Sequence, residues 1–225
     1  MFKVIYIDEY QEDIDDFLDY FEEKDTNNKF EIEYLLPENT LDEMYEKIFE
    51  KNPDAIISDY MLNEYKSDID YNVPYTGVDL TEKILDIKKN YPCFVLTSYD
   101  DQAIKTSQDV NMIYIKDILH GSEERTNAKA NFLDTVENQI IHYKKRIKNS
   151  EEELLQLIEK SNKESLNADE EARLLELDTF IEKATSQPSS LPEHLKSTKN
   201  LDELHKMIEN TDNLLEELKK LKNGD

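Results

Sequence analysis

The stretch FKVIYI at Phe2–Ile7, followed directly by Asp8 and Glu9, decides how the rest of the chain is interpreted. A run this rich in β-branched and aromatic residues is typical of a strand that is buried on both faces. A second run, Ala55–Ser58, has the same character and is also followed by an acid, Asp59. Short apolar strands that end in acids predict an α/β protein with polar chemistry at the strand ends.

Three further runs are expected to be strands, namely Phe30–Leu36, Cys93–Thr97 and Met112–Ile115. Between the runs, apolar residues recur at the i, i+3, i+4, i+7 spacing of an amphipathic helix, as at Ile14, Phe17, Leu18 and Phe21. The stretch Asp100–Asp109 predicts only a marginal helix. Five strands that alternate with helices predict βαβ crossovers, and hence a parallel sheet covered on both faces.

The composition excludes several classes of protein. The chain has 225 residues with 27 Lys and Arg against 52 Asp and Glu, a net charge of −25, which disfavours binding to nucleic acids and to anionic membranes. A single cysteine, Cys93, allows no internal disulfide, and three glycines are too few for a phosphate-binding glycine loop. We expect a cytoplasmic protein without a signal peptide or a membrane span.

Polar side chains stand at the ends of four predicted strands: Asp8 and Glu9, Asp59, Thr97 and Ser98, and Lys116. The carboxyl ends of parallel strands meet at one edge of a sheet, so these side chains are expected to lie together. A carboxylate can act as the nucleophile that accepts a phosphoryl group, and a divalent metal can bridge the neighbouring acids. A lysine and a hydroxyl can bind the remaining phosphoryl oxygens. The pattern therefore indicates aspartyl phosphorylation.

The segments IYIDE, IISDYML, FVLTS and IYIK, in this order at the strand ends, resemble a bacterial response-regulator receiver domain of two-component signalling. The resemblance covers about residues 1–147. It implies a flavodoxin-like, doubly wound sheet of five parallel strands in the order 2-1-3-4-5. We therefore expect a receiver domain over residues 1–147 and a helical region over residues 148–225.

The resemblance also implies roles for individual residues. Asp59 would be the phosphoacceptor, and Thr97 and Lys116 would contact the phosphoryl group. The magnesium ligands implied are Asp8, Glu9, Asp59 and the backbone carbonyl of Met61, with Ser98 as the small residue that admits phosphodonors. The expected donor is a sensor histidine kinase or a phosphotransfer protein. The chain would then be a signalling protein and not an enzyme beyond its own phosphorylation and dephosphorylation.

Two alternatives to this interpretation remain open. The chain departs from the family pattern at Glu9, at Asp117 after the lysine and at Ile113. These departures are compatible with a pseudo-receiver, a scaffold that assembles a complex without phosphorylation. A phosphohydrolase of the haloacid-dehalogenase type is disfavoured, because Tyr10 stands where its second aspartate would be.

The C-terminal part of the chain is predicted to be helical. Apolar residues from Leu133 to Leu157 keep a heptad seam, a second helix opens near Asn167, and a proline-containing break precedes a third amphipathic stretch from Leu201. Such helices cannot bury their apolar faces alone. They must form a three-helix bundle, form a homodimer or bind a partner protein. We expect this region to act through protein–protein contacts, because no helix-turn-helix reader of DNA is evident.

Overall fold

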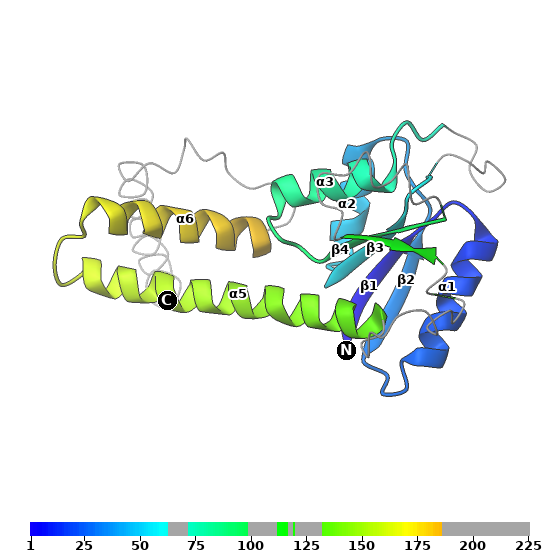
Figure 1. The fold of residues 1–225 in the computed structure, drawn as a ribbon. Coiled ribbons are helices and arrows are strands. Elements are labelled where there is room, and N and C mark those ends of the chain that lie inside the picture. The colour runs from blue at the N-terminus through cyan, green and yellow to red at the C-terminus, as the bar shows by residue number, and fades with distance from the viewer. Residues whose placement is uncertain (63–71, 99–111, 117–118, 120–131, 186–225) are drawn as a thin grey trace, which may run out of the picture.

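The computed structural model describes residues 1–62, 72–98, 112–116, 119 and 132–185. Its centre is a sheet of five parallel strands in the order β2-β1-β3-β4-β5 (Figure 1). The strands are β1 (Phe2–Ile7), β2 (Phe30–Leu35), β3 (Ala55–Asp59), β4 (Cys93–Thr97) and β5 (Ile113–Ile115). The fold is therefore flavodoxin-like, and the predicted class and strand order are confirmed.

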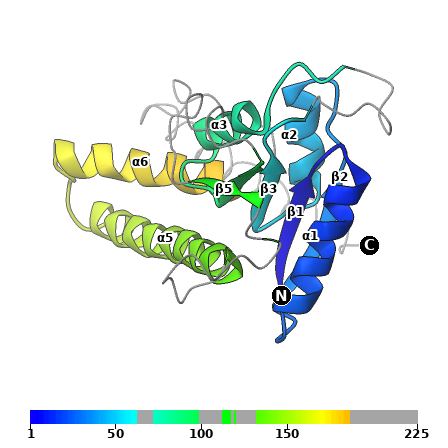
Figure 2. The ribbon, with the colours of Figure 1, turned by 45° about the vertical axis from the view of Figure 1, so that its right-hand side comes forward.

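Helices cover both faces of this sheet (Figures 1 and 2). They are α1 (Gln11–Lys24), α2 (Leu41–Glu50), α3 (Gly77–Ile87), α5 (Phe132–Ser161) and α6 (Ala168–Thr185). Helices α1 and α5 pack on one face, and α2 and α3 pack on the other. The marginal helix predicted over Asp100–Asp109 and the amphipathic stretch from Leu201 lie outside the described residues, as do Asp117 and most of the loop between Tyr60 and Thr76.

Burial on both faces explains the continuous apolar pattern of the strands. Ile5 and Ile7 of β1 face the core beneath α2 and α3, whereas Val4 and Tyr6 face the core beneath α1. Tyr6 stacks on Phe17 of α1 with ring centroids 3.8 Å apart. Since successive side chains of a strand point to opposite faces, both sets must be apolar. The first polar residue of the strand, Asp8, follows where the chain leaves the sheet.

Helix α5 connects the sheet domain to the helical hairpin that α5 and α6 form beyond it. Its first turns pack Val136 and Ile140 against the sheet, and it then continues beyond the sheet without interruption. Helix α6 runs back alongside it, as Figure 1 shows. The predicted boundary after residue 147 falls inside α5. Within the described ranges, no helix combines the length and the apolarity needed to cross a bilayer.

Candidate functional site

A cavity of about 150 Å³ lies at the carboxyl edge of the sheet. Its walls are formed by Asp8, Glu9, Tyr10, Asp13, Asp59, Tyr60, Met61, Thr97, Ser98 and Lys116. Every side chain predicted at a strand end therefore reaches one cavity, together with Met61. Asp13 and the two tyrosines were not predicted.

The strand register explains this convergence. Ile7 of β1 pairs with Ser58 of β3, so Asp8 and Asp59 follow on neighbouring strands at the same level. Thr97 of β4 pairs with Ile115 of β5, and Lys116 is the next residue of the chain. Parallel pairing thus brings residues that are far apart in sequence to one edge.

Asp59 is held by contacts to both of its oxygens. Its Oδ2 accepts a hydrogen bond from the backbone N–H of Met61 at 2.6 Å, and its Oδ1 forms an ion pair with the Lys116 Nζ at 2.7 Å. The side chain is only 9 % exposed. The carboxylate is therefore fixed in orientation while it faces the cavity.

A glycine allows α3 to begin directly against the end of β3. The backbone N–H of Gly77 donates to the carbonyl of Tyr60 at 2.9 Å. A Cβ on Gly77 would lie 2.0 Å from the carbonyl oxygen of Asp59, which is backbone and cannot move aside. Thr76 caps the helix through a reciprocal bond with Asp79. The start of α3 is thereby locked behind the Asp59 side chain.

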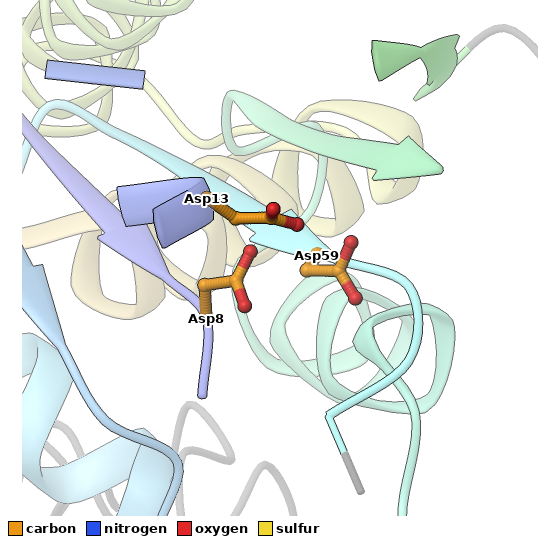
Figure 3. A group of neighbouring side chains, drawn as sticks. All are labelled: Asp8, Asp13 and Asp59. Atoms are coloured by element: carbon orange, nitrogen blue, oxygen red, sulfur yellow. The ribbon is translucent and has the colours of Figure 1, made fainter. Parts of the chain in front are cut away.

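Three carboxylates gather in the cavity, as Figure 3 shows. Asp8 follows β1, Asp59 ends β3 and Asp13 belongs to the first turn of α1, and one oxygen of each lies within 4.8 Å of the others. The hydroxyl of Tyr6 donates to Asp8 Oδ2 at 2.6 Å, and the N–H of Tyr10 donates to Asp8 Oδ1 at 3.0 Å. Oxygen ligands at this spacing could hold a metal ion.

Lys116 is the cation of this cluster. Its Nζ lies 3.2 Å from Asp8 Oδ2 and 2.7 Å from Asp59 Oδ1, and it also pairs with Asp13. Three ionised carboxylates around one ammonium group leave a local excess of negative charge. A divalent cation has the charge needed to neutralise that excess.

The protonation equilibria follow from burial and from these pairs. Burial raises the pKa of Asp59 to about 6, although the Lys116 cation opposes the shift. Burial also raises the pKa of Asp8. For Lys116, burial lowers the pKa, but the charges of Asp59 and Asp8 outweigh it and the pKa rises. Lys116 therefore stays charged, while Asp59 can be neutral in mildly acidic solution.

Asp13 is the cluster residue that sequence reasoning missed. The prediction considered only strand ends, and Asp13 lies among the acids that open a helix. It stands four residues before Phe17, whose ring stacks on Tyr6, so both side chains share the helix face that turns toward the sheet. That spacing was the available signal. Glu9 is 1 % exposed in the cavity wall, and its role as a metal ligand stays a prediction, as does that of the Met61 carbonyl.

No protein-family model matches the chain, and no curated protein matches it in sequence. What bears on its function is therefore the fold and the site. A five-stranded parallel sheet in the order 2-1-3-4-5, with an acidic cluster of Asp8, Asp13 and Asp59 at its carboxyl edge, is compatible with a receiver domain.

Proposed function

We propose that this protein is a receiver that accepts a phosphoryl group on Asp59 in a Mg²⁺-dependent reaction. The observation that carries the proposal is the buried Asp59 carboxylate at the end of β3, which shares one cavity with two further carboxylates, Lys116 and Thr97. A structural aspartate needs no such surroundings. A carboxylate that receives a phosphoryl group needs neighbours that offset the incoming negative charge.

The reaction follows from the positions of the side chains. An Asp59 oxygen attacks the phosphorus of a phosphohistidine on a sensor kinase or phosphotransfer protein and forms an acyl phosphate. The P–N bond breaks, its electron pair stays on the imidazole nitrogen, and with a proton on the ring the histidine leaves as neutral imidazole. Lys116 exchanges its contact with Asp59 Oδ1 for a phosphoryl oxygen, and the Thr97 hydroxyl donates to another. Asp8, Asp59 and either Asp13 or Glu9 would hold Mg²⁺, which would supply the positive charge that allows acids and phosphate to approach.

The output of this receiver is proposed to be protein–protein contact through its C-terminal helices. Helix α5 packs on the sheet with its first turns and forms the hairpin with α6 beyond it, so a change at the sheet has a continuous helix to act on. A partner protein or a second copy of the chain would bind the helices differently after that change. The net charge of −25 disfavours nucleic acid as the target.

A pseudo-receiver scaffold is the second candidate, and one observation favours it. Lys116 already contacts all three carboxylates of the cluster, so the acids have a counter-charge without a metal. In this case the fold persists, the lysine stays in place, and the helices assemble a complex that does not depend on phosphorylation.

Beryllofluoride, which mimics a phosphoryl group on a carboxylate, separates the two candidates. We expect Mg²⁺ with beryllofluoride to raise the melting temperature of the full chain. When the ligand concentration is a hundred times its Kd, the free energy of unfolding should increase by about 2.7 kcal/mol. The variant Asp59→Asn should lose this response, whereas Asp16→Asn on the exposed side of α1 should keep it. A wild-type chain that shows no shift, or an Asp59→Asn chain that shows the same shift, would support the scaffold.

A further inference from the structure

A second cavity, of about 660 Å³, lies between the end of α3, the middle of α5 and helix α6. We call it the junction groove. Four cationic side chains line it: Lys89, Arg146, Arg173 and Lys183. The acids in its wall are Asp86 and Glu176. In a chain whose net charge is −25, this groove therefore carries a local excess of positive charge.

The groove also offers apolar surface and an unused polar atom. Phe180 of α6 is partly exposed in its wall, as are Leu85 and Ile87 at the α3 end. The Thr179 side chain is 9 % exposed there, and its hydroxyl has no hydrogen-bond partner among the described residues. Buried polar atoms normally find a partner. Apolar walls with cations at their rim suit an acidic, amphipathic helix.

Two of the cations are available for such a helix. Arg146 already donates to Asn90 and lies over the Phe180 ring, and Arg173 is paired with acids of α5 and α6. Lys89 and Lys183 have no ion-pair partner within the described part of the chain. An acidic occupant of the groove would supply both with one.

The end of α6 is fixed beside this groove. The Lys88 ammonium donates to the carbonyl oxygens of Lys183 and Ala184 at 2.8 Å and 3.1 Å, and it lies 5.0 Å from the centre of the Phe49 ring. Cations stabilise the carbonyl end of a helix. The chain that continues from Thr185 therefore starts next to the groove.

The continuing chain contains a segment that matches the groove. Residues 201–218 read LDELHKMIENTDNLLEEL, with apolar residues at Leu201, Leu204, Ile208, Leu215 and Leu218. The stretch is acidic, because it contains several Asp and Glu residues and Lys206 as its one lysine. As a helix it would be about 27 Å long, and the connector 186–200 can span up to roughly 50 Å, so the segment can reach the groove in either direction.

We propose that residues 201–218 dock into the junction groove of their own chain, as the third helix of a bundle with α5 and α6. The apolar side chains of the segment cover Phe180, Leu85 and Ile87, and its acids face Lys89 and Lys183. This inference does not depend on phosphorylation of Asp59, so it can fail while the proposed function holds.

Hydrogen exchange on the full-length chain tests the proposal. We expect slow exchange of the amides of residues 201–218 in the wild type. The charge reversal Lys89→Glu/Lys183→Glu should speed this exchange about fivefold to tenfold, the effect of losing two partly exposed ion pairs. The matched control Lys145→Glu/Lys163→Glu changes the net charge equally at exposed positions outside the groove, and it should leave the exchange unchanged. Adding Glu209→Lys and Asp212→Lys to the groove variant should restore protection.

The other occupants give different results. Protection that falls when the protein is diluted would mean that a second copy donates the segment, and the proposal would be wrong. Fast exchange of residues 201–218 in the wild type would mean that the groove is left for another protein, which also overturns it. Equal effects of the groove and control variants would show that general charge, and not this groove, holds the segment.

Discussion

Two lysines at opposite ends of the sheet, Lys88 buried and Lys116 mostly so, contrast the candidate site with a structural joint. Lys116 stands at the carboxyl edge among the carboxylates of Asp8, Asp13 and Asp59. Lys88 follows α3 near the amino ends of the strands, with two backbone carbonyls and a phenyl ring around it. Burial lowers the pKa of Lys88, whereas the acids around Lys116 raise its pKa against the same effect of burial.

The two lysines differ in whether the groups around them can bind a metal ion or a proton. The carboxylates around Lys116 could bind a metal ion or take a proton, and in the proposed reaction this would release the lysine toward a phosphoryl oxygen. The carbonyls that hold Lys88 belong to the end of α6 and have no second protonation state near neutral pH. Lys116 therefore belongs to a site that can change its contacts, and Lys88 to a joint that fixes α6.

Removing Lys116 is the change with the largest expected effect. Lys116→Met leaves the buried carboxylates of Asp8 and Asp59 and the partly exposed one of Asp13 without a counter-charge, and losing one partner of such a group should cost about 3–5 kcal/mol of unfolding free energy at neutral pH. Mg²⁺ should restore much of this loss. Acid should do so too, because the pKa of Asp59, about 6 in the presence of Lys116, rises further once the lysine is gone and the carboxyl takes up a proton. Urea unfolding with chelator and with Mg²⁺ measures both. A loss that neither Mg²⁺ nor acid relieves would show that Lys116 acts by packing.

Removing Lys88 should give a smaller and different loss. Lys88→Met leaves the carbonyls of Lys183 and Ala184 without their donor, which should cost about 1–3 kcal/mol. Because the acceptors that lose their donor are backbone carbonyls, Mg²⁺ should not restore this loss. Hydrogen exchange should rise in the last turns of α6 and stay unchanged in α1, on the far side of the molecule. A Mg²⁺-dependent rescue here would remove the distinction between the two lysines.

The smallest effect is expected for Asp59→Asn, which mimics the protonated acid. The folded pKa of about 6 lies above the unfolded value near 3.9, so the native state binds more protons between these limits and loses stability as the pH rises through them. The variant lacks that loss. The amide NH2 of the variant must face either the Lys116 ammonium or the Met61 N–H, both of which are donors, so we expect a net gain of only about 1–2 kcal/mol at pH 7 without metal, fading below pH 4. Unfolding curves at pH 4 and pH 7 give the comparison, and a variant that is destabilised at pH 7 would contradict it.

The two regions also differ in how far the sequence predicts them. The parallel sheet follows from the alternation of strands and helices, whereas the strand order came from the resemblance to receiver domains. The carboxyl ends of parallel strands share one edge, so Asp59, Thr97 and Lys116 could be placed together there. Asp13 was not predicted as a site residue, because its place in the cluster depends on how α1 packs on the sheet. The seating of α6 on Lys88 could not be predicted at all, because a lysine that caps a helix 95 residues away leaves no local pattern.

Chemical labelling of the full-length chain tests the central claim most directly. A small acyl phosphate donor is added with Mg²⁺ or with chelator, and the modified peptide is mapped by mass spectrometry. We predict one phosphoryl group on Asp59, formed only with Mg²⁺ and absent from Asp59→Asn. A chain that gains no phosphoryl group under these conditions, or gains it on another residue, would contradict the account.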